Sequence, residues 1–182
     1  MFDTDKIIKY FYSEDDPAFE ILMLHSTQVR NKALSIAGKF PEADRELIAA
    51  GAMVHDIGIR FCMAPGLGCF GEDEYILHGI LGAEKLRFLG FEGAEKLARI
   101  CERHTGSGIS ADEIYQNKMP LPEKDFLPET LEEKIVCLAD KFFSKSGDFQ
   151  EKSLEKISME MAKFGDGPCR RFKDLCNELK VF

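Results

Sequence analysis

Apolar residues recur three and four positions apart along most of the 182-residue chain, and this spacing constrains the fold more than any other feature. Such spacing places apolar side chains on one stripe of an α-helix, whereas a half-buried strand shows strict alternation. No stretch alternates over a useful length, and no internal repeat or low-complexity tract interrupts the pattern. We therefore predict an all-α fold in which a helical bundle buries one core.

The same spacing, read together with capping signals, predicts core helices that begin near residues 17, 44, 79, 93 and 129. Gly58 should end the second of these helices. The fifth, residues 129–145, has acidic residues in its first turn and lysines in its last, which suits the helix dipole.

A helical tail should follow at residues 150–164 and 168–180, with a break at Gly165-Asp166-Gly167-Pro168. We expect the tail to pack on the core through Ile157, Met161 and Phe164. The length of the chain suits a single domain, residues 1–182, with a core at about 17–146 and the tail at about 150–182.

Two segments look irregular, residues 62–74 and 105–128. Connections this long in a compact domain are usually functional, so both are expected to shape a substrate pocket. Gly66-Leu67-Gly68 lacks the Lys-Ser/Thr ending of a phosphate-binding loop, and we interpret it as a flexible rim.

Composition excludes several classes of protein. The net charge of −8 argues against stable binding to nucleic acid or to an anionic membrane surface. No stretch approaches the roughly 18 to 20 apolar residues of a membrane helix, and the acidic start lacks the layout of a signal peptide. We therefore expect a cytoplasmic protein, in which most of the six cysteines are small buried residues. Cys62 and Cys69 could alternatively form a metal or redox pair.

The chain has four histidines, and each lies on or beside an apolar helical stripe: His25, His55, His78 and His104. One such histidine is usually an ordinary core residue, but four without any surface histidine indicate a shared role. Asp56 follows His55, and Asp140 lies on an apolar helix face, where a carboxylate needs a metal or a cationic partner. The alternative partners Lys141 and Lys145 should point away from or past that face. Imidazole and carboxylate ligands together suit Zn, Mn, Fe and similar ions.

His25, the string His55-Asp56-Ile57-Gly58 and the downstream Ala139-Asp140-Lys141 resemble the signature of the HD-domain superfamily of metal-dependent phosphohydrolases. The resemblance spans about residues 20–146 and implies a compact HD-like bundle with a C-terminal helical extension. It further implies that His25, His55, Asp56 and Asp140 bind one divalent metal. His78 and His104 match the positions of two further histidines in two-metal members, in which Asp56 would bridge the ions. The metals would be two of Fe, Mn, Zn, Ni or Mg.

The resemblance also implies the chemistry: metal-activated water attacks a phosphate ester or anhydride of a small molecule, and we expect a nucleotide or dinucleotide. Asp56, Arg60 and Lys141 would be catalytic, the two cations by stabilising charge on the phosphate oxygens. Some relatives carry Lys directly after the His-Asp-Ile-Gly string, where this chain has Ile59 and then Arg60. The alternative for these cations is a solvated helix surface.

Candidate substrate-binding residues lie after the last histidine and after the last aspartate: Thr105, Gly106, Ser107, Gly108 and Lys145. Small residues let backbone N–H groups approach a phosphate, although a helix C-cap with Gly106 in the left-handed region explains the same sequence. Water should be the nucleophile, because no Ser, Thr or Cys stands beside a histidine that is free to act as a base. Two other functions fit the same ligands: a metal- and nucleotide-binding regulatory module with little turnover, and a di-iron oxygenase.

Overall fold

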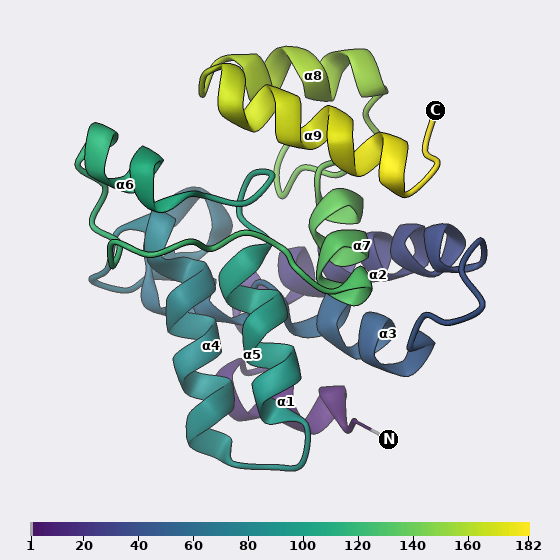
Figure 1. The fold of residues 1–182 in the computed structure, drawn as a ribbon. Helices are drawn as coiled ribbons and strands as arrows, with labels where there is room; N and C mark the ends of the chain where they lie inside the picture. Colours follow the sequence, from purple (N-terminus) through teal and green to yellow (C-terminus); the bar gives the residue numbers. More distant parts are fainter. Residues whose placement is uncertain (1) are drawn as a thin grey trace.

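The computed structural model describes residues 2–182 as helices joined by turns and one small hairpin (Figure 1). The α-helices are α1 (Thr4–Phe11), α2 (Pro17–Ala37), α3 (Arg45–Val54), α4 (His78–Leu89), α5 (Ala94–Arg103), α6 (Ala111–Asn117), α7 (Leu131–Asp140), α8 (Leu154–Ala162) and α9 (Asp166–Glu178). Short 3₁₀ helices are η1 (Ile57–Phe61), η2 (Pro65–Leu67) and η3 (Tyr75–Leu77). The strands β1 (Met63–Ala64) and β2 (Cys69–Phe70) pair antiparallel. The prediction of an all-α fold is confirmed.

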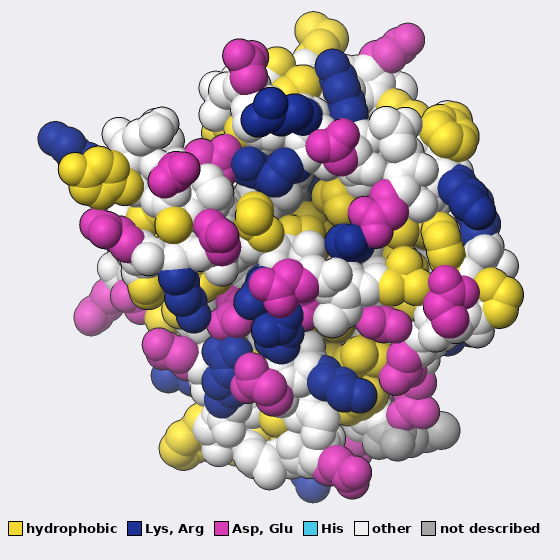
Figure 2. Space-filling model, in the orientation of Figure 1, with side chains coloured by type: hydrophobic (Ala, Val, Ile, Leu, Met, Phe, Trp, Pro, Cys, Tyr) yellow, Lys and Arg dark blue, Asp and Glu magenta, His cyan; other side chains and the backbone are white. Residues whose placement is uncertain are grey.

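The core is built from pairs of packed helices. The helices α4 and α5 lie side by side, and α2 packs against both α3 and α7 (Figure 1). The helices α8 and α9 pack on each other in a separate layer, which lies beyond the C-terminal end of α7 (Figure 1). Charged side chains of both signs are interspersed over the face drawn in Figure 2, and no histidine is visible on it, because all four are buried.

The predicted helix starts agree with the structure, and the caps explain why. The side chain of Asp44 accepts a hydrogen bond from the Leu47 backbone N–H and starts α3. Thr130 and Glu133 form a capping box at the start of α7. Pro17 occupies the first turn of α2, where its missing N–H costs no helical hydrogen bond.

Two predicted helix ends were wrong. The helix α3 ends at Val54 rather than at Gly58, and the chain turns directly into η1. The helix α7 ends at Asp140 rather than at 145, because the next backbone N–H groups bond three residues back and tighten the last turn. Prediction also missed α1, α6 and the hairpin, each too short to show a clear periodicity.

The tail packs on the core, but not through all the residues expected. Ile157 and Met161 are buried in the same apolar core as α2, α3 and α7. Phe164 is 71% exposed, contrary to prediction, because it lies in the turn after α8. The break between the tail helices is shorter than predicted: α9 begins at Asp166, and Pro168 sits in its first turn. Within residues 2–182, none of the helices is both long enough and apolar enough to cross a membrane.

Gly58 allows η1 to pack directly on the start of α4. A methyl group at this position would overlap the carbonyl oxygen of His78 and the backbone nitrogen of Gly82. Because these are backbone atoms, neither could move aside without shifting α4. This close approach holds the chain after Asp56 against the residue that begins α4.

We predict that Gly58→Ala destabilises the protein by about 2 kcal/mol or more, since overpacking against fixed backbone forces a helix to move. Gly66→Ala is the matched control, because no atom lies within 4 Å of a methyl group there and its φ is not positive. Urea unfolding followed by circular dichroism gives both free energies. Equal stability of the two variants would contradict the close packing of η1 on α4.

Candidate metal centre

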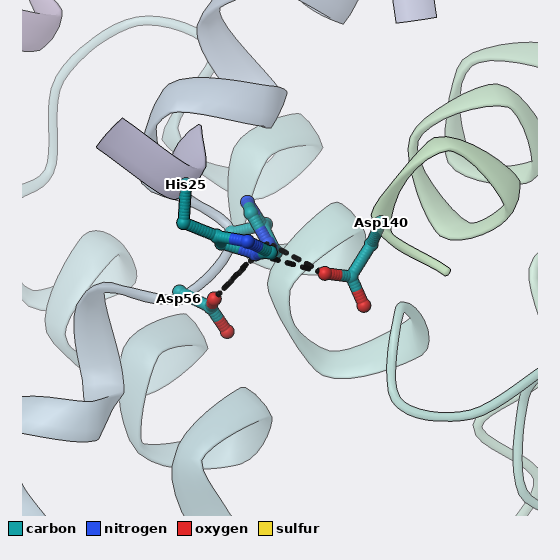
Figure 3. A group of neighbouring side chains, drawn as sticks. His25, Asp56 and Asp140 are labelled. Carbon is teal, nitrogen blue, oxygen red and sulfur yellow. Dashed lines mark hydrogen bonds and ion pairs between the residues drawn. The ribbon is translucent and has the colours of Figure 1, made fainter. Parts of the chain in front are cut away.

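Three separate elements bring the first group of ligands together. His25 projects from α2, His55 and Asp56 follow α3, and Asp140 is the last residue of α7. His25 Nε2 lies 2.9 Å from Asp140 Oδ1 and 3.2 Å from Asp56 Oδ2. His55 Nε2 lies 3.2 Å from Asp56 Oδ2 and 3.4 Å from Asp140 Oδ1. Figure 3 shows the His25 ring between the two carboxylates, so residues 115 positions apart in the chain converge on one point.

A second group forms on the other oxygen of Asp56. His78 Nε2 lies 3.4 Å from Asp56 Oδ1, and His104 Nε2 lies 3.3 Å from it. The two imidazole nitrogens are 3.0 Å apart. Within each group the ligand atoms all lie within 4.8 Å of one another. Asp56 therefore belongs to both groups and presents one oxygen to each.

Backbone carbonyls orient three of the four rings. The Nδ1 atoms of His55, His78 and His104 lie 2.7 to 2.8 Å from the carbonyl oxygen three residues earlier. A carbonyl can only accept, so each Nδ1 carries a proton, and in the neutral form of each ring Nε2 directs its lone pair at the centre. This is the arrangement in which imidazole binds a metal ion.

The donor set fits divalent metal ions. The Nε2 lone pairs of His78 and His104 face each other at 3.0 Å, which is repulsive without a cation or proton between them. Asp56 is fully buried, and Lys145 Nζ lies 2.7 Å from its Oδ2, whereas its Oδ1 faces the imidazoles of His78 and His104. A buried carboxylate in this state is costly unless a cation binds it. Imidazole nitrogen and carboxylate oxygen suit Zn, Mn, Fe and Ni.

The charges of the centre shift the pKa values of its members in opposite directions. Burial opposes the ionisation of Asp140, but the charges of Lys141 and Lys145 hold its pKa well below the usual range. Burial also opposes a charge on His55, yet the carboxylates of Asp56 and Asp140 outweigh it and raise the pKa of His55 to about 9. The two carboxylates are therefore available as anionic ligands, while a metal must displace a proton from His55.

His78 behaves differently from His55. Burial and the neighbouring His104 lower the pKa of His78 to about 3, and burial also lowers the pKa of His104. Both rings are neutral at physiological pH, which is the state that binds a metal.

Two lysines approach the centre, contrary to the expectation that they would point away from Asp140. Lys141 Nζ lies 2.7 Å from Asp140 Oδ2 and donates to the carbonyl oxygen of His104 at 3.3 Å. Lys145 Nζ lies 2.7 Å from Asp56 Oδ2, and the ion pairs with Asp56 and Asp140 raise its pKa against the effect of burial. The early end of α7 explains the difference, because the tight turn after Asp140 directs these side chains back.

Arg60, predicted as a catalytic cation, has its partners outside the two ligand groups. Its guanidinium pairs with Asp16 at 3.4 Å and lies 5.8 Å from the ring centre of Tyr12. It therefore links η1 to the start of α2 and does not join the ligands.

The segment after His104 also differs from the prediction that it binds substrate. The Ser107 hydroxyl donates to the Pro168 carbonyl oxygen at 2.8 Å, and the Arg171 guanidinium donates to the carbonyls of Ser107 and Gly108. The remaining members, Thr105 and Gly106, do not line the pocket beside the ligands either. The positive φ of Gly106 agrees with the capping alternative, and the segment anchors α9.

A pocket of about 580 Å³ opens beside Asp140, Lys141 and Lys145. The hairpin formed by β1 and β2 contributes Met63 to the lining of the pocket. Tyr75 also lines it and stacks on the ring of His78, with 4.8 Å between the ring centroids. Sequence analysis missed the other residues that line this pocket, among them Tyr75, Phe143, Lys152, Glu160 and Met161. Among these residues, only Tyr75 could have been suspected from the sequence, because it stands three positions before the candidate ligand His78.

None of the described cysteines belongs to a group of side chains that could hold a metal ion. Cys62 and Cys69 are buried, and their thiols face the carbonyl oxygens of Gly58 and Leu67. Neither belongs to a group that could bind an ion in the described part of the chain, and burial raises the pKa of both thiols.

Comparison with known families gives a match over residues 22–144 to the HD domain family. This segment includes all the ligands of both groups. The chain belongs to the HD family. Its fold also resembles the crystal structure of the HD domain of the L. monocytogenes phosphodiesterase PgpH, with a TM-score of 0.51 and 18% identity over 88% of this chain and 92% of that one.

Three curated proteins are similar to this HD protein. A tRNA (cytidine(56)-2′-O)-methyltransferase of Picrophilus torridus is 37% identical over 76% of this chain and 38% of the relative. An uncharacterized protein of Methanocaldococcus jannaschii is 47% identical over 59% and 55% of the two chains. A tRNA (cytidine(56)-2′-O)-methyltransferase of Thermoplasma volcanium is 32% identical over 80% and 41%. The aligned part thus spans between 38% and 55% of the length of these relatives.

We predict that Asp140→Asn lowers divalent-metal affinity by about 100-fold or more while the helical fold remains, because an amide is nearly isosteric but a poor ligand. Asp112→Asn is the matched control, since Asp112 is exposed on α6. Calorimetric titration with Zn²⁺ gives the affinity, and circular dichroism reports the fold. Unchanged affinity in Asp140→Asn would remove Asp140 from the centre.

We predict that His78→Ala or His104→Ala reduces bound metal from two ions to one per chain, because each belongs to the second group only. His25→Ala should instead disrupt the first group. Metal content after dialysis, measured by plasma mass spectrometry, separates these outcomes. A wild-type protein that binds one ion, with no loss in either second-group variant, would contradict a two-metal centre.

Proposed function

We propose that this HD protein hydrolyses a phosphate ester or anhydride of a small molecule, with a nucleotide or dinucleotide as the substrate. HD family membership and the His and Asp donor set support a metal-dependent phosphohydrolase at the family level. The observation that carries the proposal is Asp56, which presents one oxygen to each ligand group beside a pocket flanked by Lys141 and Lys145.

Each group of residues has a distinct part in this proposal. Metal ions held by the two ligand groups would supply an activated water and positive charge for the phosphate oxygens. Lys141 and Lys145 place two more cations at the same wall of the pocket, where they stabilise charge that develops during phosphoryl transfer. Backbone carbonyls orient His55, His78 and His104, so these three rings need no movement before reaction.

The pocket supports a substrate larger than a phosphate ion. Its volume of about 580 Å³ lies within the usual range for small-molecule sites. Tyr75, Met63 and Phe143 offer apolar and aromatic surface to a nucleobase, next to the charged wall. Two relatives bear the name of a tRNA methyltransferase, and their nucleic-acid substrate favours nucleotide chemistry over sugar phosphates.

Hydrolysis should vanish when metal is removed by a chelator and return when Mn²⁺, Fe²⁺ or Zn²⁺ is added. A phosphate-release screen with nucleotides, dinucleoside polyphosphates and phosphodiesters tests this, with Asp140→Asn as the inactive reference. Reaction in H₂¹⁸O should place one ¹⁸O atom in the product phosphate, because water is the nucleophile. Thiol alkylation should leave the rate unchanged, since Cys62, Cys69, Cys101 and Cys137 are buried away from the pocket.

Three results would contradict the proposal. Hydrolysis that continues after confirmed metal loss would exclude the metal-dependent mechanism. A fully metal-loaded protein that binds nucleotides but hydrolyses no compound of the panel would be a regulatory module. Substrate-dependent O₂ consumption by the iron-loaded protein, without phosphate release, would indicate a di-iron oxygenase.

A further inference from the structure

The C-terminal extension contributes a lysine to the wall of the pocket. Lys152 lies just before α8 and beyond the segment that matches the HD family. Its backbone N–H donates to the carbonyl oxygen of Phe142 at 2.8 Å, in the turn between Lys141 and Lys145. This bond fixes the position of Lys152 relative to the two lysines of the metal centre.

The side chain of Lys152 is 13% exposed and pairs with Glu160 of α8. Its Nζ lies 2.8 Å from Glu160 Oε2, and both residues line the same pocket as Asp140, Lys141 and Lys145. The pocket therefore has a further ion pair, which the extension alone supplies.

The two sets of lysines have different partners. Lys141 and Lys145 pair with the metal-ligating Asp140 and Asp56, so they belong with the phosphate that reacts. Lys152 pairs with neither aspartate among the described residues. An ammonium has three N–H donors, and within residues 2–182 that of Lys152 bonds one acceptor, Glu160. Two donors remain for a ligand in the pocket.

We infer that Lys152 binds a second phosphate group of the substrate, separate from the one that is cleaved, and that Glu160 limits this affinity by competing for the ammonium. The inference rests on the proposed function and narrows its substrate class to compounds with at least two phosphates, such as nucleoside or dinucleoside polyphosphates. A lysine bonds phosphate through a charge-assisted hydrogen bond, which is stronger than a neutral one. The carboxylate of Glu160 repels phosphate, so its removal should have the opposite effect from the removal of Lys152.

Direct binding to the Mn²⁺-loaded protein tests this without requiring turnover. The probes are methylenediphosphonate, which carries two phosphonate groups, and inorganic phosphate, which carries one. Calorimetric titrations with the same Mn²⁺ concentration in cell and syringe cancel chelation by the probe. The variants are Lys152→Gln and Glu160→Gln. Their controls are Lys156→Gln and Glu155→Gln, at exposed positions of α8.

Lys152→Gln should weaken the binding of methylenediphosphonate about tenfold, which is the effect of one hydrogen bond to a charged group. The affinity for inorganic phosphate should stay within about twofold of the wild-type value. Glu160→Gln should strengthen the binding of methylenediphosphonate about threefold, which is the size of effect expected for a partly exposed ion pair. Both control variants should bind like the wild type. Lys152→Arg keeps the charge and should retain most of the preference for two phosphonates.

An ion pair that only anchors α8 would give a different result. Lys152→Gln and Glu160→Gln would then lower the melting temperature alike and change the binding of both probes in the same direction, which would overturn the inference. If Lys152→Gln fails to fold, the other two variants still test the inference. Glu160→Gln should bind methylenediphosphonate more tightly than the wild type, and Lys152→Arg should keep most of the preference for two phosphonates. Hydrolysis of the nucleotide panel by the wild type tests the proposed function separately. A protein that hydrolyses but shows no Lys152 dependence overturns this inference alone, whereas one that shows the dependence without turnover overturns hydrolysis alone.

Discussion

The structure depends on one buried carboxylate, that of Asp56. Enclosing a charged group costs several kcal/mol unless cations or hydrogen bonds compensate for the lost water. Here the Lys145 ammonium lies 2.7 Å from one oxygen of Asp56, and two pairs of imidazoles, one on each oxygen, are placed to hold cations against the carboxylate. The side chains around Asp56 lie on, or directly after, helices that include α2, α4, α5 and α7. The two ligand groups can therefore form only when these helices are packed together.

Sequence analysis could find the candidate ligands that the structure brings together, because burial and chemistry conflict at those positions. A histidine or aspartate on an apolar helical stripe, such as His25 or Asp140, contradicts its surroundings unless it has a partner, and that contradiction is visible without coordinates. The long helices could be predicted because apolar residues recur at helical spacing along their whole length. The direction of Lys141 and Lys145 could not, because it follows from a tightened turn after α7 that the amphipathic pattern of residues 129–145 conceals.

The other errors share a physical cause: the partner lies far away in the sequence. Ser107 looked like a phosphate-binding residue beside small neighbours, yet its hydroxyl bonds Pro168, 61 residues later. Arg60 lies two residues after the signature, but it pairs with Asp16 at the start of α2. Lys152 and Glu160 look like ordinary charges of a solvated helix, and only the return of α8 to the core gives them a common pocket. The local sequence pattern predicts the chemistry that a side chain can perform, whereas tertiary packing determines which partners it contacts.

This distribution of residues implies a division of labour along the chain. The segment that matches the HD family contains every candidate ligand of both groups, and backbone carbonyls of the same segment orient the rings of His55, His78 and His104. The extension adds no ligand, but it supplies Lys152, Glu160 and Met161 to the pocket, and α9 holds the segment after His104 in place. A ligand set needs positions accurate to a few tenths of an ångström, and the closely packed core provides them. A pocket wall tolerates change, because a new side chain there alters which substrate fits without disturbing the ligands. Substrate choice can therefore vary through the extension while the metal centre stays constant.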